Sequence, residues 1–333
     1  GETGFGAGRV LLSLLCFLDE QAPIFARTAP HTEHSNTPNP SYALEFASVE
    51  LHPLSVERLE GLLTLFKGRL PTIDGHIQQI VKAYRQFDLS LVAGPKLKEQ
   101  LVANGVDAAK IEVTGYSKFE GIDFDAQPDF FGNGRPTFVY NPHFDPHLSS
   151  WYDAGPEVLR WFASEAGQAY NLIFAPHVML FRKSVHISPE YKVGRVRPHI
   201  PDAARAAPNI LIDTDGPRLF DMSYMLAADG YIGDASSQIY EFLMRPRPVF
   251  LLDPNAALGS QGEEVLPFLR TGPRVESVND LGSAIGGWDE IGSRYRAEQE
   301  RLIAHTFALS EVPASQRAAD AIAAAIARRN GAL

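Results

Sequence analysis

The side chains best suited to bind a ligand or take part in catalysis lie in the segment 233–241, Gly-Asp-Ala-Ser-Ser-Gln-Ile-Tyr-Glu. An apolar segment here runs into Ser236 and Ser237, which open a predicted helix. Hydroxyls and free backbone N–H groups at a helix N-terminus can bind a phosphate. Serine is also a common N-cap, so the pattern has a structural alternative. Glu241 lies one position too late for a capping box with Ser237, which leaves its carboxylate free for another role.

A second candidate is His177, which follows the apolar segment 170–175 and a proline. A histidine in this place can donate to a phosphate or take part in proton transfer. The alternative is a structural histidine bonded to loop carbonyls. Basic residues that can offset the charge of a diphosphate follow it in the sequence: Arg182, Lys183, Arg195 and Arg197.

A third candidate is the stretch 141–147, Asn-Pro-His-Phe-Asp-Pro-His, which directly follows a predicted strand. His143, Asp145 and His147 suggest a metal, but they lack the fixed spacing of a helix-based ligand pair, and a phosphate-binding loop fits equally well. We therefore predict no metal site. Two aspartates that each follow a predicted strand are further cleft candidates: Asp213, whose Asp-Thr-Asp-Gly context usually forms a turn, and Asp234.

Short apolar segments alternate with helical segments along the chain, which is typical of parallel sheets with crossover helices. The predicted strands are 89–93, 111–116, 137–140, 170–175, 210–212, 230–233 and 248–252. The predicted helices are 56–66, 77–84, 96–104, 155–165, 219–227, 237–244, 293–308 and 314–329. Ligands bind beyond the carboxyl ends of strands in such sheets, so we expect the candidates above to share one edge.

Length, composition and net charge limit the functions that are possible. The 333 residues suffice for two domains, and the Pro- and Gly-containing stretch 127–136 is the candidate linker. A formal net charge of -10, with no run of Lys and Arg, argues against a general nucleic-acid binder. The single cysteine, Cys16, favours a reducing compartment and a cytoplasmic address. The apolar run 10–18 is about half the roughly 20 residues that a membrane span needs, so we expect a buried first strand or helix.

The second half of the chain resembles the CDP-glycerol:poly(glycerophosphate) glycerophosphotransferases, a family of teichoic-acid and capsule polymerases. The resemblance rests on residues 221–237, Asp-Met-Ser-Tyr-Met-Leu-Ala-Ala-Asp-Gly-Tyr-Ile-Gly-Asp-Ala-Ser-Ser, on Glu-Phe-Leu at 241–243 and on Arg-Pro-Val-Phe at 247–250. This run is similar to the family's order of helix, Ala-Asp, apolar strand, Asp-x-Ser-Ser, helix and Arg-Pro-strand.

The resemblance implies an α/β fold of the GT-B type, with two Rossmann-like domains whose parallel sheets face each other across a cleft. Residues 1–130 would form the acceptor-side domain and residues 136–305 the domain that binds the nucleotide donor. Residues 306–333 would form a C-terminal helix that packs back on the domains. The family implies no metal and no other cofactor.

The resemblance also assigns roles by position. Ser236 and Ser237 would bind the donor phosphate, and Glu241, where many relatives have Asp, would bind the ribose hydroxyls. His177 matches the histidine of the family's Arg-x-His-Pro strand end, which reads Ala-Pro-His-Val here. The family's presumed base lies in a His-Gly-Thr-Pro motif that this chain lacks, and His76, in Asp-Gly-His, is the histidine shortly upstream of the matching strands.

The expected activity is transfer of glycerophosphate, or of a related polyol phosphate, from a CDP-activated donor to a hydroxyl of a cell-surface glycan or teichoic-acid-like acceptor. Two alternatives stay open: a GT-B glycosyltransferase that uses a nucleotide sugar, and a GT-B binding protein that has lost its base. The expected partners are a nucleotide-diphosphate donor and a glycan or lipid-linked acceptor, with peripheral contact to the inner face of the membrane left open.

Overall fold

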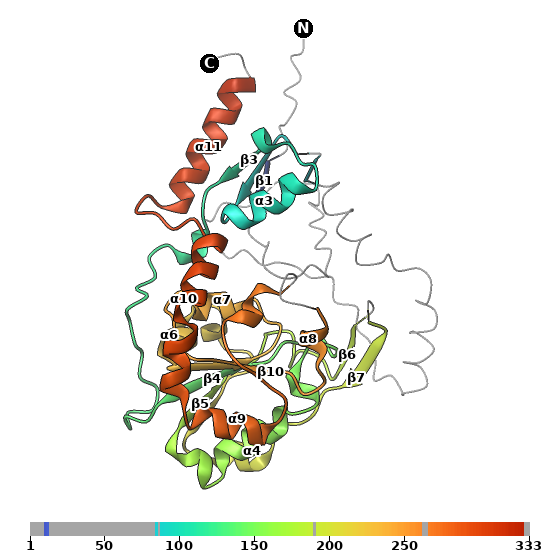
Figure 1. The fold of residues 1–333 in the computed structure, drawn as a ribbon, viewed down its shortest axis with the longest axis vertical. Helices are drawn as coiled ribbons and strands as arrows, with labels where there is room; N and C mark the ends of the chain where they lie inside the picture. The colour runs from blue at the N-terminus through green and yellow to red at the C-terminus, as the bar shows by residue number, and fades with distance from the viewer. Residues whose placement is uncertain (1–9, 13–83, 86, 189–190, 262–265, 330–333) are drawn as a thin grey trace, which may run out of the picture.

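The computed structural model describes residues 10–12, 84–85, 87–188, 191–261 and 266–329 (Figure 1). His76, the predicted helix 56–66 and nearly all of the predicted helix 77–84 lie outside these residues. The described residues form a six-stranded parallel sheet, a three-stranded parallel sheet and an antiparallel hairpin. The prediction of parallel α/β architecture is therefore confirmed. Within the described part of the chain, no helix is long and apolar enough to cross a membrane.

The larger sheet has the strand order β11-β10-β9-β4-β5-β8, with every neighbouring pair parallel. Its strands are β4 (Thr137–Asn141), β5 (Asn171–Phe174), β8 (Ile210–Ile212), β9 (Gly230–Gly233), β10 (Val249–Leu252) and β11 (Arg274–Val275). All except β11 coincide with predicted strands to within two residues at each end. They are short apolar segments. The sheet buries every residue of β4, β5, β9 and β10, the usual condition of parallel strands, whereas the edge strand β8 is half-buried.

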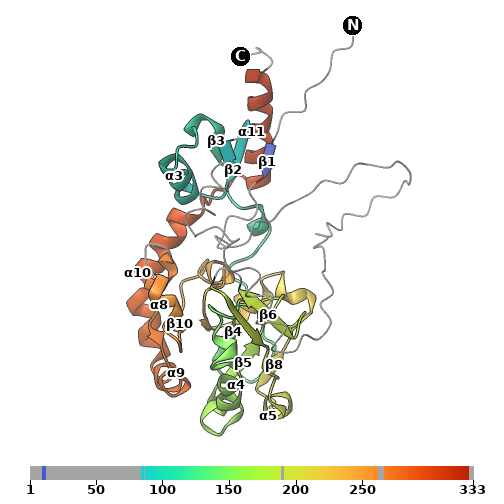
Figure 2. The same cartoon turned by 90° about the vertical axis from the view of Figure 1, so that its right-hand side faces the viewer.

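Helices cover both faces of this sheet (Figures 1 and 2). They are α4 (Gly155–Ala163), α5 (Asp202–Ala206), α6 (Ser223–Ala227), α7 (Gln238–Phe242), α8 (Ala257–Gln261), α9 (Val278–Ile285) and α10 (Trp288–Thr306). Along β4, Phe138 belongs to the core cluster that includes α4 and α9, whereas Val139 belongs to the one that includes α6, α7 and α10. Successive strand side chains point to opposite faces, so one strand contributes to both cores.

The order of the strands contains a topological switch point. From β4 the chain moves outward to β5 and β8, then returns to place β9 on the opposite side of β4. Asn141 at the end of β4 pairs in register with Gly233 at the end of β9, while Tyr140 pairs with Phe174 of β5. The loops that follow these three strands therefore emerge side by side, at the place where open α/β sheets bind ligands.

The hairpin of β6 (Val185–Ser188) and β7 (Val193–Val196) lies between β5 and β8 in the sequence and was not predicted. Its two strands pair with each other and belong to neither parallel sheet. In β6 the residues alternate between half-buried and buried, and the buried ones are His186 and Ser188. Polar residues on the buried side conceal the apolar alternation by which a strand is usually detected.

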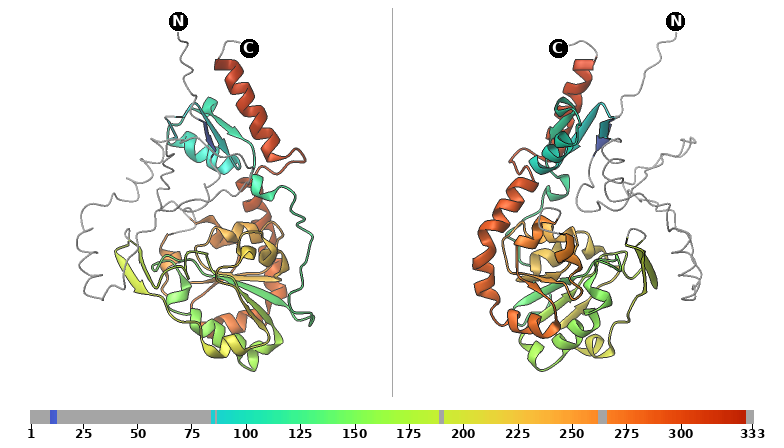
Figure 3. Two further views of the ribbon diagram at one scale, coloured as in Figure 1. Left: turned by 180° about the vertical axis from the view of Figure 1, so that it is seen from behind. Right: turned by 45° about the vertical axis from the view of Figure 1, so that its right-hand side comes forward.

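The smaller sheet has the order β1-β2-β3, formed by β1 (Val10–Leu12), β2 (Leu89–Val92) and β3 (Ile111–Val113). The first three residues of the apolar run 10–18 thus form a strand, and residues 13–18 lie outside the described part. α3 (Pro95–Ala103) follows β2, and α11 (Ala314–Arg329) lies beside this sheet (Figure 3). α10 runs along the larger sheet and ends next to α3, where the side chains of His305 and Glu99 pair.

Gly94 allows the end of α10 to approach the end of β2. A Cβ built at Gly94 would lie 2.0 Å from the carbonyl oxygen of Thr306. Nearby, the backbone N–H of Ala308 donates to the carbonyl of Ala93 over 2.8 Å. We expect Gly94→Ala to force these backbones apart and cost about 1–3 kcal/mol, measured as a lower thermal midpoint. Gly287→Ala, whose Cβ would meet nothing closer than 3.9 Å, is the control, and equal midpoints would contradict the close approach.

Candidate functional site

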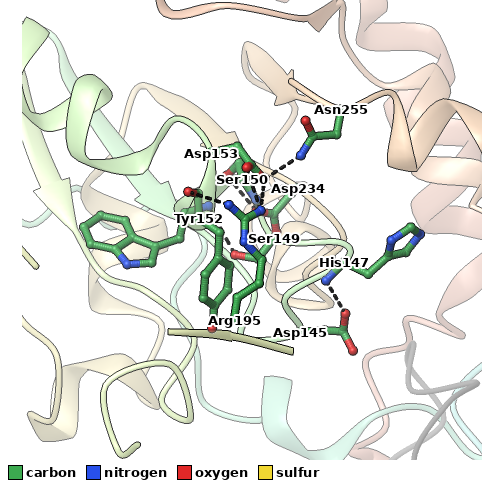
Figure 4. A network of polar contacts seen from close by, with 10 residues as sticks. Asp145, His147, Ser149, Ser150, Tyr152, Asp153, Arg195, Asp234 and Asn255 are labelled. Atoms are coloured by element: carbon green, nitrogen blue, oxygen red, sulfur yellow. Dashed lines mark hydrogen bonds and ion pairs between the residues drawn. The ribbon is translucent and has the colours of Figure 1, made fainter. Parts of the chain in front are cut away.

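The carboxyl ends of β4 and β9 are joined by the side chain of Asp234, which is fully buried (Figure 4). Its Oδ1 accepts from the backbone N–H of His143 over 2.8 Å. Its Oδ2 accepts from the backbone N–H and the hydroxyl of Ser150, at 2.6 and 2.7 Å. Asp234 follows β9 and both partners follow β4, so this carboxyl fixes the course of the loop that carries His143.

Burial dominates the electrostatics of Asp234. It raises the pKa of the carboxyl to about 7, although hydrogen bonds from Ser150 and His143 oppose the rise. The hydroxyl of Ser150 is also 2.9 Å from the hydroxyl of Tyr140, which extends the network into the core. Because the Asp234 side chain has no exposed surface, it supports the site and does not present a group to a ligand.

Two histidine side chains lie close together beyond the carboxyl ends of β4 and β5. The ring centroids of His143 and His177 are 5.2 Å apart, and the ring of Phe144 lies 4.4 Å from the first and 4.8 Å from the second. Burial lowers the pKa of His143 to about 4 and that of His177 to about 3, with smaller contributions from neighbouring histidines and, for His177, from Arg182. Both imidazoles are therefore neutral near pH 7.

Backbone contacts select the tautomer of both rings. Nδ1 of His143 accepts from the N–H of Asp145 over 3.1 Å, and Nδ1 of His177 accepts from the N–H of Met179 over 3.2 Å. A neutral imidazole whose Nδ1 accepts carries its proton on Nε2. Neither Nε2 has a hydrogen-bond partner within the described ranges. These histidines are thus prepared as N–H donors, and their basic nitrogens are already in use.

A third histidine, His186 of β6, lies beside this pair and was not singled out in the sequence. Its ring is 6.3 Å from that of Phe144 and 6.2 Å from that of Tyr152. Its Nε2 lies 3.1 Å from the carbonyl of Met179, whereas its buried Nδ1 has no partner in the part of the chain described. The sequence could have pointed to His186 only if the hairpin had been predicted, because its place on the buried side of β6 follows from the alternation of that strand.

Two of the four predicted cations are engaged within the protein. Arg195 donates to both carboxylate oxygens of Asp153, at 2.6 and 2.7 Å, and Asn255 donates to the same carboxylate (Figure 4). Arg197 donates to the carbonyl of Lys183 over 3.1 Å, and its guanidinium lies 4.1 Å from the ring centroid of Phe181.

Arg182 and Lys183 are exposed, and no carboxylate of the described residues pairs with either. They are the two of the four cations that stay available to an anion beside His177. Across residues 84–85, 87–188, 191–261 and 266–329, no three His, Cys, Asp or Glu side chains are grouped so that they could hold a metal ion.

The two serines differ in their surroundings. Ser236 is fully buried, its backbone N–H donates to the carbonyl of Asp234 over 2.8 Å, and its hydroxyl accepts from the N–H of Gln238 over 3.4 Å. Ser237 is half-buried and is the N-cap residue of α7, but its side chain makes no capping hydrogen bond. Ordinary N-capping therefore does not explain Ser237. Phosphate binding at this segment stays a prediction, and Ser237 is the serine whose hydroxyl a ligand can reach, because Ser236 is fully buried.

Glu241 forms an ion pair with Lys118. Lys118 belongs to a short turn of helix, Ser117–Phe119, that follows β3 of the smaller sheet, whereas Glu241 belongs to α7 beside the larger one. Burial raises the pKa of Glu241, and Lys118 acts against this rise. The predicted ribose-binding carboxylate thus lies where the two sheets meet.

The remaining aspartates organise turns. Asp145 accepts from the backbone N–H of His147 over 2.8 Å. Asp213 accepts from the N–H of Gly216 over 2.6 Å and from the hydroxyl of Tyr224 over 2.8 Å. The turn that the Asp-Thr-Asp-Gly sequence indicates is therefore present.

The smaller sheet has a cavity of its own, of about 270 Å³. Leu91 and residues 114–117, at the carboxyl ends of β2 and β3, form one wall. α11 forms the other, through small and apolar side chains: Ala314, Ser315, Ala318, Ala319 and Ile322. Its lining is mainly apolar.

Comparison with known proteins identifies the fold. No family model and no curated protein sequence matches the chain. Among solved structures, the wall teichoic acid polymerase TagF superposes with a TM-score of 0.51 at 14% sequence identity, over 76% of this chain and 61% of that one. A variant of the same polymerase gives 0.50 at 13% identity, over 76% and 62%.

The chain thus spans less than two thirds of these solved chains, and at such identity the likeness concerns the fold. It confirms the expected α/β fold of the GT-B type. The structural resemblance is to a teichoic acid polymerase, as the Asp-x-Ser-Ser segment predicts.

Proposed function

We propose that this protein is a metal-independent transferase that moves glycerophosphate, or a related polyol phosphate, from a CDP-activated donor to a hydroxyl of a glycan or teichoic-acid-like acceptor. The observation that carries the proposal is the pair of neutral histidines, His143 and His177, at the switch point of the larger sheet. The fold shared with the wall teichoic acid polymerase supports the choice of reaction.

The donor diphosphate would lie against the Nε2–H groups of His143 and His177, with Ser237, Arg182 and Lys183 as further contacts. The acceptor oxygen forms a bond to the distal phosphorus, and the bond from that phosphorus to the oxygen of CMP breaks. Negative charge develops on the departing CMP, and preorganised N–H donors stabilise it. The acceptor proton passes to a base, for which His76 stays our candidate.

We further propose that the two sheets bind different substrates. Residues 136–305 would bind the donor and residues 1–130 the acceptor, with 306–333 packed back on them. The cavity between β2, β3 and α11 supports an acceptor site on the smaller sheet, because its apolar lining suits the carrier end of a lipid-linked glycan. Such an acceptor would bring the protein to the inner face of the membrane.

Ser237 offers a direct test of the donor site. We expect Ser237→Ala to weaken CDP binding by about tenfold or more, since a hydrogen bond to a charged group contributes about 1.5–3 kcal/mol. The melting temperature should stay unchanged, because the Ser237 hydroxyl makes no capping bond. Isothermal titration calorimetry with CDP and with UDP provides the measurement.

Ser236→Ala is the matched control, because its hydroxyl is buried against the N–H of Gln238. We expect Ser236→Ala to lower the melting temperature and to leave the affinity for CDP close to that of wild type. Equal CDP affinity in wild type and Ser237→Ala would exclude Ser237 from the donor site. A preference of the wild type for UDP would favour a nucleotide-sugar glycosyltransferase, and CDP binding without turnover would favour a binding protein.

A further inference from the structure

We propose that Lys118 is a positioning residue for the donor ribose: it holds Glu241 as an ionised, oriented carboxylate that accepts hydrogen bonds from the ribose hydroxyls. The inference rests on the proposed function, since it assumes that a nucleotide binds beside α7. It adds a residue from the smaller sheet to a site that is otherwise built on the larger one.

The ion pair is local in space and distant in sequence. Nζ of Lys118 meets Oε1 of Glu241 although 123 positions separate the two residues. The side chains are 29% and 12% exposed, so the carboxylate is the more enclosed partner. The contact thus joins the turn that follows β3 to the helix α7.

One oxygen of the carboxylate stays available. Lys118 occupies Oε1, and Oε2 of Glu241 has no hydrogen-bond partner in residues 84–85, 87–188, 191–261 and 266–329. An ionised carboxylate offers about four acceptor positions on its two oxygens. It can therefore take both vicinal hydroxyls of a ribose while Lys118 stays in contact.

Glu241 depends on Lys118 for its charge. The other ionisable groups around Glu241 are the phenols of Tyr116 and Tyr231, together with Arg218 and Tyr224, which line a small cavity with Glu241. Burial raises the pKa of Tyr116 and that of Tyr224 to about 12 and raises that of Tyr231 well above its usual value, so all three phenols are neutral. Arg218 is also directed elsewhere, with its guanidinium 5.0 Å from the ring centroid of Phe130.

Stability alone does not account for the pair. The desolvation of an enclosed ion pair commonly cancels its Coulombic gain, so replacement by an apolar side chain of similar volume is often neutral for folding. A neutral carboxyl, in contrast, carries a proton on one oxygen and loses part of its capacity to accept from a diol. The effect of losing Lys118 should therefore fall on ribose recognition.

The experiment compares CDP with 2′,3′-dideoxycytidine 5′-diphosphate by calorimetry. Wild type should prefer CDP by about tenfold or more, the effect of hydrogen bonds to a charged acceptor. Lys118→Met and Glu241→Gln should lose this preference by binding CDP more weakly, while both bind the dideoxy compound as wild type does. Lys118→Arg should keep the preference. Arg301→Met, which removes an exposed cation paired with Glu298 on α10, is the control and should match wild type.

A pH series separates positioning from simple structural support. Without Lys118 the pKa of Glu241 rises further, and buried glutamates can reach about 8–9. Lys118→Met should thus regain its preference for CDP as the pH increases from 7 to about 9, whereas Glu241→Gln should not. If Lys118→Met lowers the melting temperature, Lys118→Gln carries the same comparison.

The outcomes distinguish the two proposals. A wild type that binds neither nucleotide contradicts the proposed function itself. A wild type that prefers CDP, together with a Lys118→Met variant that prefers it equally at every pH, overturns the role of Lys118 and leaves the donor site intact. Equal binding of both nucleotides by wild type overturns ribose recognition by Glu241.

Discussion

Replacement of His177 by alanine is expected to lower the transfer rate by about 10²–10³-fold, the usual effect of removing one preorganised donor to a developing negative charge. The reason is structural: Nδ1 of His177 already accepts from the N–H of Met179, so Nε2–H is the group that would stabilise the CMP that leaves in the proposed reaction. The measurement is CMP release from CDP-glycerol in the presence of a teichoic-acid-like acceptor.

His177→Gln distinguishes a donor from a base. A glutamine amide can place an N–H near the position of Nε2 but cannot accept a proton in catalysis, so this variant should retain more activity than His177→Ala. His305→Ala, on the exposed end of α10, is the control and should act as wild type. Equal loss in the Gln and Ala variants would show that His177 acts as the base.

Acid should leave this donor role intact over a wide range. With pKa values of about 4 for His143 and about 3 for His177, both rings stay neutral well below pH 6. A decrease in rate between pH 7 and pH 5 would then report another group, such as the base. This behaviour follows from burial, which no sequence pattern around the two histidines reveals.

The sequence predicts best where structure is decided locally. The strand at 137–141 has the apolar centre Phe-Val-Tyr, lies between turn-forming residues and is buried on both faces, so its composition identifies it. Once the strands are placed, topology brings His143 and His177 to one edge. Their closeness was therefore predictable in outline from the positions of two strands.

Contacts between distant segments could not be predicted. Nothing in the sequence indicates a partner for Arg195, yet its guanidinium pairs with the carboxylate of Asp153, 42 positions away. Ser236 and Ser237 look equivalent, but packing buries the hydroxyl of the first and leaves the second without a capping bond. β11 is too short for any periodic signal, because it has two residues.

Asp234→Ala is the second variant with a large expected effect, because it removes the acceptor of three hydrogen bonds at once. The N–H groups of His143 and Ser150 are buried with it, and each unsatisfied buried group costs about 1–3 kcal/mol. The loop that carries His143 should lose its fixed course. We therefore expect both a lower melting temperature and a large decrease in transfer rate.

We expect the stability loss in Asp234→Ala to become smaller as the pH rises. The folded-state pKa of Asp234, about 7, lies above the usual value near 3.9 for an unfolded chain, because burial disfavours its charge. The contribution of Asp234 to stability is then full below about pH 4 and decreases as the pH rises through 7. The difference in melting temperature between wild type and Asp234→Ala should thus be larger at pH 5 than at pH 8.

Asp107→Ala supplies the comparison, since Asp107 is an exposed residue that caps one turn by accepting from the N–H of Ala109 over 2.9 Å. Its loss should cost about 0.5–2 kcal/mol and leave the transfer rate unchanged. If Asp234→Ala kept full activity, the loop after β4 would not need its tie to β9. If its stability loss instead grew from pH 5 to pH 8, the ionised carboxylate would be the stabilising form, and burial would not control its charge.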